Sequence, residues 1–270
     1  MRFTNKTILI TGATGGFGRE FTKQLLAKNN TLILTDLDEA TLTEMALTAE
    51  KEAGTGRVLQ CIASDLSTRE GCQTLFDRIQ ELGHPLDVLI NNAGIALMGR
   101  HDEVPLARWE QLLEINLASP MRLTALFTPQ MIERRQGHII NLASVASWTS
   151  DVGLSAYSAS KFGLRGFSVA LADELKPHNI QVSAIYPFYS RTPILNSPRF
   201  GTLAEAVPPD PENVPGVTNP ADVIRNALAQ AENDKLHIFP DRVGRIIYQL
   251  QKFPALFDWF RQKISAATYN

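Results

Sequence analysis

A tyrosine and a lysine four residues apart form a pair that could move a proton. Tyr157 and Lys161 occur in the run Y-S-A-S-K, within a stretch that predicts a helix over Ala156–Pro177. Side chains at i and i+4 share one face of a helix. A phenol with its ordinary pKa of about 10 is a poor base at neutral pH, but a neighbouring ammonium stabilises the phenolate and lowers that pKa. Because the same spacing is also found on solvated helix faces, the pair needs other motifs beside it.

A glycine-rich run near the N-terminus could hold a phosphate group. Residues 11–18 read T-G-A-T-G-G-F-G, directly after the apolar run Thr7–Thr11 and directly before a helical stretch. A backbone without side chains can turn sharply and approach a pyrophosphate, and the helix N-terminus supplies N–H donors. The alternative is a tight turn that binds nothing. The position between a strand and a helix favours a dinucleotide site.

An acidic residue ends the second apolar run, L-I-L-T-D. Asp36 lies 18 residues after Gly18, where a carboxylate can accept hydrogen bonds from the adenosine ribose and repel the extra phosphate of NADP. Leu37 and Asp38 follow it, and the glycine run has no basic residue before Arg19. The pattern favours NAD over NADP; the alternative is that Asp36 only caps a turn.

Short apolar runs bounded by turn residues must position these groups. Runs that are apolar without alternation are typical of parallel strands covered on both faces. The predicted strands are Thr7–Thr11, Thr31–Thr35, Val58–Ile62, Asp87–Asn91, His138–Leu142, Gln181–Tyr186 and Lys235–Phe239. The predicted helices between them are Gly18–Asn29, Glu39–Ala53, Arg69–Leu82, Leu106–Arg134 and Ala156–Pro177. This alternation predicts an α/β fold, a Rossmann-type doubly wound parallel sheet of about seven strands with helices on both faces, as a single domain over residues 1–270.

One segment breaks the alternation. Residues 187–220 contain eight prolines, a density that resists both helix and strand. A long loop inside a compact domain is usually a binding element. We expect residues 187–220 to form a lid over the substrate.

In this set of motifs the chain resembles the short-chain dehydrogenase/reductase family over nearly its whole length. The matching pieces occur in the family's order: the glycine run at 11–18, Asp65, N-N-A-G at 91–94, Asn116, Ser144 and Y-S-A-S-K at 157–161. One of these motifs is a weak signal, whereas the ordered set is specific. The resemblance implies an NAD(H)-dependent interconversion of a secondary alcohol and a ketone.

The resemblance also implies a role for each catalytic residue. Tyr157 would be the general acid/base, and Lys161 would hold the nicotinamide ribose and depress the pKa of the tyrosine. Ser144, 13 residues before Tyr157, would hydrogen-bond the substrate oxygen. Asn116 would support its helix and anchor a relay water beside Lys161. The hydride belongs to the cofactor, so the protein supplies position and proton transfer.

The implied cofactor contacts extend beyond the glycine run. The full set is Gly12, Thr14, Gly15, Gly16, Phe17, Gly18, Asp36, Leu37, Asp65, Leu66, Asn92, Ala93, Gly94, Tyr157, Lys161, Pro187 and Thr192. The N-N-A-G segment could equally be a strand-terminating turn. The chain departs from the family at 187–192, P-F-Y-S-R-T, where Phe188 stands in place of the usual glycine. Phe188 could close the pocket or face the lid.

The expected surroundings of the reacting carbon are mostly apolar. The implied substrate-binding residues are Ser144, Trp148, Tyr157, Phe188 and Tyr189, with Ala96, Leu97, Val145, Ile194 and Leu195 close by. Such a lining suits a hydrophobic small-molecule alcohol or ketone. Many of these residues could instead belong to the core.

The composition argues against a nucleic-acid-binding, metal-binding, secreted or membrane-spanning protein. The net charge of −2 gives no field that would attract nucleic acid, and the five histidines form no metal-binding pair. The two cysteines lack metal-like spacing and indicate a reducing compartment. The N-terminal apolar run is too short for a signal peptide or membrane span. We therefore expect a cytoplasmic protein without a metal.

The C-terminal extension, residues 241–270, has an amphipathic pattern. From Arg242 to Ile264, apolar residues recur close to the helical period, basic residues are interspersed, and Pro254 should interrupt the pattern. Three interpretations remain open: a helical hairpin that covers the active site or core, a subunit contact, and a peripheral membrane contact.

Two other functions also remain open. One is an NADP-dependent ketoacyl reductase, against which Asp36 argues. The other is a non-catalytic NAD-binding sensor or scaffold, because a fold does not fix a function. Family members commonly pair through the helices that carry Asn116 and Tyr157, so we expect a homodimer or homotetramer.

Overall fold

Seven parallel strands form the sheet that positions the site. A computed structural model of the chain describes residues 1–206, 216–255 and 257–258. The strands are β1 (Thr7–Thr11), β2 (Thr31–Asp36), β3 (Arg57–Ala63), β4 (Val88–Asn91), β6 (Gly137–Leu142), β7 (Ile180–Ile185) and β9 (His237–Ile238). Their order is β3-β2-β1-β4-β6-β7-β9, so the chain reverses direction across the sheet between β1 and β4. The predicted Rossmann-type sheet is confirmed, and ligands bind at such a reversal, beyond the carboxyl ends of the strands.

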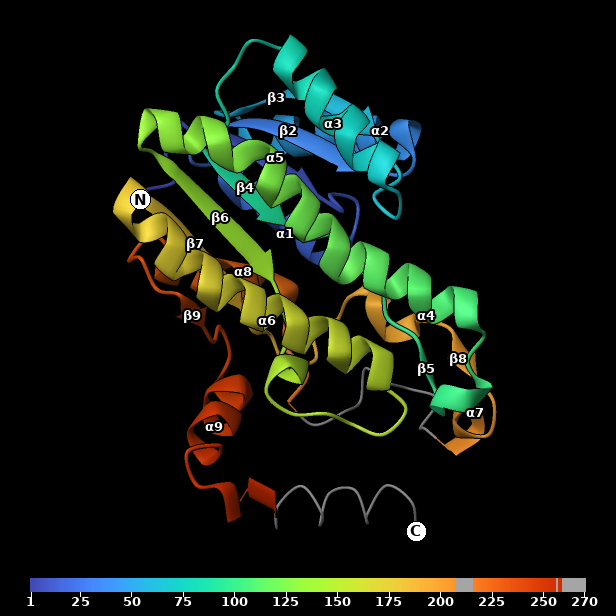
Figure 1. Ribbon diagram of the computed structural model, residues 1–270. Helices are drawn as coiled ribbons and strands as arrows, with labels where there is room; N and C mark the ends of the chain where they lie inside the picture. The colour runs from blue at the N-terminus through green and yellow to red at the C-terminus, as the bar shows by residue number, and fades with distance from the viewer. Residues whose placement is uncertain (207–215, 256, 259–270) are drawn as a thin grey trace.

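Helices cover both faces of this sheet (Figure 1). One face carries α1 (Gly16–Leu26), α2 (Glu39–Ala53) and α8 (Pro220–Ala231), whose side chains share a core with Ile8 and Ile10. The other carries α3 (Arg69–Glu81), α5 (Ser119–Arg134) and α6 (Ser155–Leu175), which share a core with Leu9. Alternate strand residues thus face opposite layers, which is why the strand sequences are apolar throughout. Helix α8 lies outside the predicted helices because it starts directly after the proline-rich segment.

The helix expected over Leu106–Arg134 is not uniform. It consists of α4 (Leu106–Leu113), a wider π-helical turn over Glu114–Ala118, and α5. Asn116 lies in this turn, and its side chain bonds the backbone of Ile95 instead of facing solvent. Single π-helical turns inside α-helices are frequent at functional sites.

The lid segment contains more regular structure than expected. Its described part includes a 3₁₀ turn (Pro193–Asn196), β8 (Arg199–Phe200) and α7 (Leu203–Ala206). Strand β8 pairs in parallel with β5 (Met98–Gly99), in the loop that follows β4. Two-residue strands leave no periodic signal, so the sequence could not predict this pairing. Residues 207–215 of the expected lid lie outside the described residues.

Helix α9 (Arg242–Leu250) extends away from the sheet at the C-terminal end of the chain (Figure 1). Its inner face packs Tyr248 on Phe239 and Trp148, with ring centroids 4.5 and 4.9 Å apart. Ile246 and Phe253 remain 49% and 63% exposed. The inner face thus covers part of the core, and the hairpin, subunit and membrane interpretations stay predictions. Residues 256 and 259–270 of that extension lie outside the described part. No described helix combines the length and apolarity that a membrane span requires.

Candidate active site

The glycine-rich turn between β1 and α1 forms a cradle of bare backbone. Gly12 has a φ of +63°, and a Cβ on it would lie 2.7 Å from Ala93 Cα. A Cβ on Gly16 would lie 2.5 Å from Thr192 Cγ2, so Thr192 lies against the turn. No side chain fits at either glycine, so the turn keeps bare backbone N–H groups at the N-terminus of α1, which is the arrangement that binds a pyrophosphate.

Asp36 is bound to this turn. Its Oδ2 accepts hydrogen bonds from Thr14 N at 2.9 Å and Thr14 Oγ1 at 2.6 Å, and its Oδ1 accepts one from Leu37 N at 2.9 Å. The turn-capping alternative is therefore part of its role. A carboxylate has about four acceptor positions, so it can still receive a ribose hydroxyl.

Arg19 lies at the same place, which the sequence did not indicate. Its Nε donates to the carbonyl oxygen of Thr14 at 2.9 Å, so a cation and a carboxylate both hold Thr14. The side chain of Arg19 is otherwise exposed. A basic group beside the adenosine ribose position is relevant to the choice between NAD and NADP.

Other predicted cofactor residues have structural bonds of their own. Asn92 Nδ2 donates to the carbonyl oxygens of Thr11 and Gly12, at 2.8 and 2.9 Å. Asp65 Oδ1 closes a turn with Ser67 N, and the side chain of Leu66 is in the core. The cofactor contacts of Asp65, Leu66 and Asn92 stay predictions, and those of Leu66 would have to involve its backbone.

Asn116 and Lys161 meet at the exit of β4. Asn116 Oδ1 accepts from Ile95 N and its Nδ2 donates to Ile95 O, both at 2.9 Å. Lys161, 4% exposed, donates from Nζ to Leu142 O at 2.9 Å. A Cβ on Gly94 would lie 3.3 Å from Asn116 Oδ1 and 3.6 Å from Lys161 Nζ. The structure therefore brings together groups from β4, the π-helical turn, β6 and α6.

Ser144 and Tyr157 form the second half of this group. Ser144 Oγ accepts from Ala146 N at 3.0 Å, and its hydroxyl is close enough to the phenol of Tyr157 to lower the pKa of that phenol. Since the serine oxygen accepts from Ala146, its own proton is free to point at the phenol or at a substrate oxygen beside it. Lys161 Nζ lies 5.6 Å from the centroid of the Tyr157 ring. All four predicted catalytic residues are thus neighbours.

Burial dominates the acid–base properties of the pair. Burial raises the pKa of Tyr157, while the Ser144 hydrogen bond lowers it. Burial also lowers the pKa of Lys161 to about 8. Burial is the largest influence on the pKa of Tyr157 in the protein alone, and the depression of that pKa by Lys161 together with a bound nicotinamide stays a prediction.

Tyr189, one of the predicted substrate residues, is paired with Asp151. The Tyr189 hydroxyl donates to Asp151 Oδ2 at 3.4 Å. Burial, followed by the charges of Asp151 and Tyr157, raises the pKa of Tyr189. No motif marks Asp151, and the only sequence signal is its position between Ser144 and Tyr157.

The two remaining substrate candidates lie farther toward α9. The Phe188 ring packs edge-on against Tyr189 at 5.0 Å and lies beside Gly216 of the lid segment. Trp148 belongs to an aromatic cluster with Tyr186, Phe239 and Tyr248, and Arg165 stacks on it at 3.5 Å. Substrate contacts of Phe188 and Trp148 therefore stay predictions.

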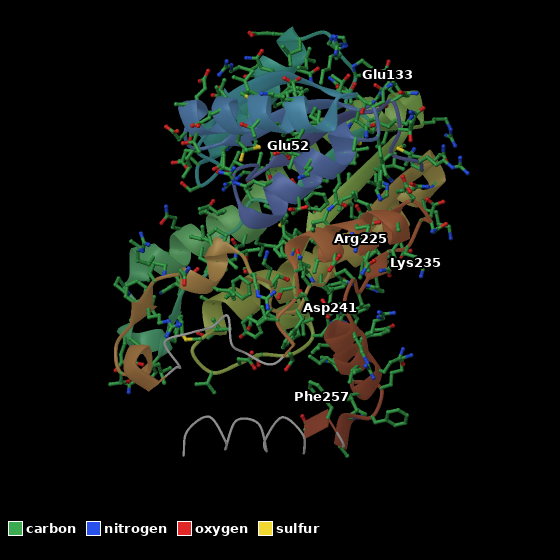
Figure 2. All side chains as sticks on the ribbon, turned by 180° about the vertical axis from the view of Figure 1, so that it is seen from behind. Glu52, Glu133, Arg225, Lys235, Asp241 and Phe257 are labelled. Atoms are coloured by element: carbon green, nitrogen blue, oxygen red, sulfur yellow. The ribbon has the colours of Figure 1, made fainter. Side chains whose placement is uncertain are left out.

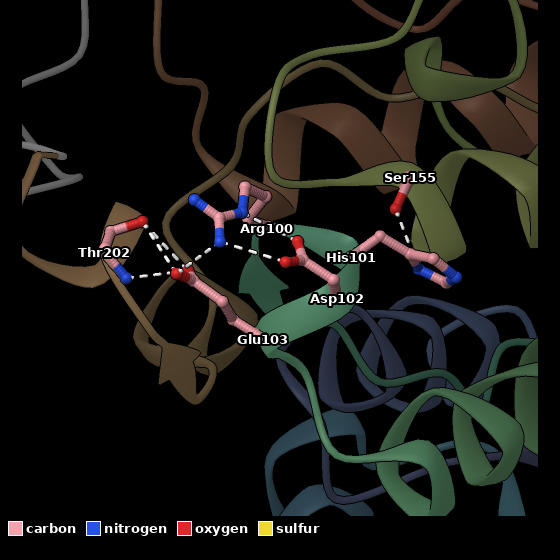
Figure 3. A network of polar contacts seen from close by, with 6 residues as sticks. All are labelled: Arg100, His101, Asp102, Glu103, Ser155 and Thr202. Atoms are coloured by element: carbon pink, nitrogen blue, oxygen red, sulfur yellow. Dashed lines mark hydrogen bonds and ion pairs between the residues drawn. The ribbon is translucent and has the colours of Figure 1, made fainter.

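A polar network fastens the lid segment to the loop after β4 (Figure 3). Glu103 accepts hydrogen bonds from Thr202 N at 2.8 Å and Thr202 Oγ1 at 2.9 Å. Arg100 pairs with Glu103 at 3.0 Å and with Asp102 at 2.7 Å. The network adds to the β5–β8 pairing, so residues 199–202 are attached to the loop after β4 at two points. Across the described residues, no three His, Cys, Asp or Glu side chains are grouped as metal ligands.

Known proteins share this sequence pattern and fold. The short chain dehydrogenase family model matches residues 6–200. The 3-oxoacyl acyl-carrier-protein reductase FabG of Aquifex aeolicus is 33% identical over 194 residues, which cover 71% of this chain and 77% of the relative.

Two solved structures are similar over most of their length. A short-chain dehydrogenase from Sphingobium yanoikuyae in complex with NADPH has a TM-score of 0.79 and 25% identity, covering 94% of this chain and 95% of that one. A 3-oxoacyl acyl-carrier-protein reductase from Brucella melitensis with bound NAD has a TM-score of 0.71 and 27% identity, covering 88% and 91%. With the family model matching well over half of its residues, the chain belongs to the short-chain dehydrogenase/reductase family of oxidoreductases.

Proposed function

We propose that this oxidoreductase interconverts a hydrophobic secondary alcohol and a ketone with NAD(H). The observation that carries the proposal is the position of the buried Lys161, whose Nζ bonds Leu142 O and lies 5.6 Å from the centroid of the Tyr157 ring. The Ser144 hydroxyl lowers the pKa of the same phenol. A phenol, a hydroxyl donor and a buried ammonium form a set that can bind one substrate oxygen and exchange a proton with it.

The chain's residues divide the work as follows. When bound, the nicotinamide cofactor supplies or accepts the hydride. Tyr157 donates its proton to the carbonyl oxygen during reduction and removes it during oxidation, while Ser144 holds that oxygen by a hydrogen bond. Lys161, with a pKa of about 8, is mostly protonated at neutral pH. Its ammonium can therefore bind a ribose hydroxyl and stabilise a developing phenolate.

Asp36 supports NAD as the cofactor. Its carboxylate is fixed by Thr14 at the carboxyl end of β2, where a 2′-phosphate would meet a negative charge. The second candidate is an NADP-dependent ketoacyl reductase, which the similarity to the Aquifex reductase and the position of Arg19 favour. A guanidinium beside the ribose could bind the extra phosphate that Asp36 repels.

The packing around Tyr157 supports a hydrophobic substrate. Its ring contacts an apolar cluster that contains Leu97, Leu112, Trp109 and Phe200, so the β5–β8 lid base contributes to it. Apolar lining with few polar groups is typical of sites for small hydrophobic ligands.

We further propose a homodimer or homotetramer formed through the outer faces of α5 and α6. Met121 on α5 and Phe162 on α6 are each 43% exposed, which is unusual for large apolar side chains.

The two cysteines, neither of them in a disulfide, fit a reducing compartment such as the cytoplasm.

Turnover of a panel of secondary alcohols and ketones, each with NAD(H) and NADP(H), tests the proposal. We expect activity on hydrophobic members with NAD(H). Turnover only of ketoacyl thioesters with NADPH would establish the second candidate instead. Binding of NADH without turnover of any substrate would contradict both.

A further inference from the structure

A buried carboxylate connects the C-terminal helix to the active site. Asp241 lies between β9 and α9, where the chain leaves the body of the protein (Figure 2). It is only 7% exposed. An ionised group in such a position needs strong hydrogen bonds to offset its desolvation.

Asp241 obtains these bonds from two separate parts of the chain. Its Oδ1 accepts from Gly244 N at 2.7 Å, which is an ordinary N-cap for α9. Its Oδ2 accepts from Phe188 N at 2.8 Å, 53 residues earlier in the sequence. An N-cap uses only one carboxylate oxygen, so the bond from Phe188 N to Oδ2 adds nothing to the capping of α9.

Phe188 belongs to the backbone segment that enters the active site from β7. On one side of it, Pro187 O accepts from Val145 N at 3.0 Å, next to Ser144. On the other side, Tyr189 O accepts from Thr218 N at 2.9 Å, and the Tyr189 hydroxyl donates to Asp151 Oδ2 at 3.4 Å. Asp241 provides the middle of these three attachments.

Helix α9 is seated closely enough to act as this attachment. A Cβ on Gly244 would lie 3.2 Å from Tyr186 O and 3.2 Å from Val145 Cγ2. The Phe188 ring and Val243 both lie against Gly216. Phe188 is also not among the residues with positive φ, so its backbone path needs no glycine. The first turn of α9 thus accommodates both the amide and the ring of the residue that replaces the family's glycine.

We infer that Asp241 is a positioning residue for the reaction: its carboxylate fixes Phe188 and Tyr189 relative to Ser144 and Tyr157, and makes the active site depend on α9. The inference rests on the proposed alcohol–ketone chemistry for its kinetic readout. Its structural part, the attachment of residues 188–190 through the carboxylate, is independent of that chemistry.

Two substitutions separate positioning from helix capping. Asp241→Ala removes both bonds, whereas Asp241→Ser keeps a good N-cap hydroxyl but is too short to reach Phe188 N as well. We expect Asp241→Ser to recover most of the melting temperature that Asp241→Ala loses. We also expect kcat to fall about tenfold or more in both variants, because small displacements of aligned groups cost large factors. The Kd of the cofactor should stay within about threefold of the wild-type value, since Asp241 does not contact the glycine turn.

Asp38→Ala is the matched control. Asp38 caps α2 through Thr41 N at 2.7 Å, and its substitution measures what the loss of an aspartate cap alone does to kcat. If Asp241→Ser restores kcat together with the melting temperature, Asp241 is only a cap and the inference is wrong.

Hydrogen exchange gives a readout without substrate. In Asp241→Ser, amides 188–190 should exchange faster than in the wild type, while amides of α9 keep their protection. Unchanged exchange at 188–190 would overturn the inference even for an active enzyme. If the wild type lacks turnover but the expected exchange pattern is seen, the proposed function fails while the attachment through Asp241 stands.

Discussion

Removing the charge of Asp36 should weaken the discrimination against NADPH. In Asp36→Asn the amide oxygen can still accept from Thr14 N and Oγ1, the two donors at 2.9 and 2.6 Å. The amide nitrogen would then face Leu37 N, but Leu37 is 69% exposed, so water can replace that bond. The glycine turn should therefore keep its shape, and the charge is the main property that changes.

The size of the effect follows from Coulomb's law. Unit charges about 5 Å apart interact by about 0.8 kcal/mol in bulk water and about 3 kcal/mol at an effective dielectric constant of about 20. Because about 1.4 kcal/mol corresponds to a factor of ten, the expected range is about fourfold to two-hundredfold. Asp36 is half-exposed, and the charge of Arg19 at Thr14 opposes part of the repulsion. We therefore expect the ratio of the NADPH and NADH dissociation constants to fall by about tenfold.

Fluorescence titration of NADH and NADPH measures this ratio without a substrate. Asp38→Asn is the control. It removes an equal charge two residues after Asp36, from a side chain that caps α2. The difference between the two variants should shrink as the salt concentration rises, since screening weakens exposed charge pairs. Equal changes in both variants, or an unchanged ratio in Asp36→Asn, would refute the reasoning.

The remaining predictions concern the proton donor, a buried histidine, the lid and α9. Tyr157→Phe should lower kcat by about 10²- to 10⁴-fold and leave NADH affinity within about threefold, and full turnover would exclude Tyr157 as the acid/base. Burial lowers the pKa of His138 from 6.5 to about 3. As the pH drops, the unfolded chain therefore binds a proton on His138 before the folded chain does. Between about pH 6.5 and pH 3, the free energy of unfolding should fall by up to about 1.4 kcal/mol for each unit by which the pH drops. Urea titrations at several pH values should show that the free energy of unfolding depends less on pH in His138→Gln than in the wild type. Equal slopes against pH would exclude His138 as the source of the effect. Glu103→Ala, which removes the acceptor of Thr202 N, should raise the KM of a hydrophobic ketone without changing the Kd of NADH. An equal rise in both constants would indicate a general structural effect instead. If the exposed face of α9 contacts membranes, Ile246→Asp with Phe253→Asp should reduce co-sedimentation with anionic vesicles, and wild-type protein that stays in the supernatant would exclude that contact.

The sheet and the catalytic group could be predicted because they share one geometric rule. Gly12, Gly94 and Ser144 each follow a parallel strand, and the carboxyl ends of parallel strands lie at one edge. Asn116 and Lys161 then need only a helix beside that edge. Each of these positions is determined by local sequence, either a strand run or a helical spacing.

The missed features depend on contacts between distant residues. The Tyr189–Asp151 and Phe188–Asp241 bonds span 38 and 53 residues, and β5 pairs with β8 across about a hundred residues with only two residues on each side. No periodicity reports such pairs. The burial that raises the pKa of Tyr157 and the bond from Lys161 to Leu142 O likewise depend on the packed interior, which no local motif reports.

The register of α6 is set by polar rather than apolar contacts. Leucine-rich surfaces can slide past one another at small cost, whereas a buried amide that loses its partner costs free energy. Asn91 Nδ2 donates to Asn141 Oδ1 at 2.8 Å, and Asn141 Nδ2 donates to Ser168 Oγ at 2.9 Å, which links β4 and β6 to α6. Ser168 lies about two helical turns after Lys161 on the same face. Sliding α6 along the sheet would break this ladder at the same time as it moved Lys161 from Leu142 O. The ladder therefore gives a physical reason why Tyr157 and Lys161 keep their position at the strand ends.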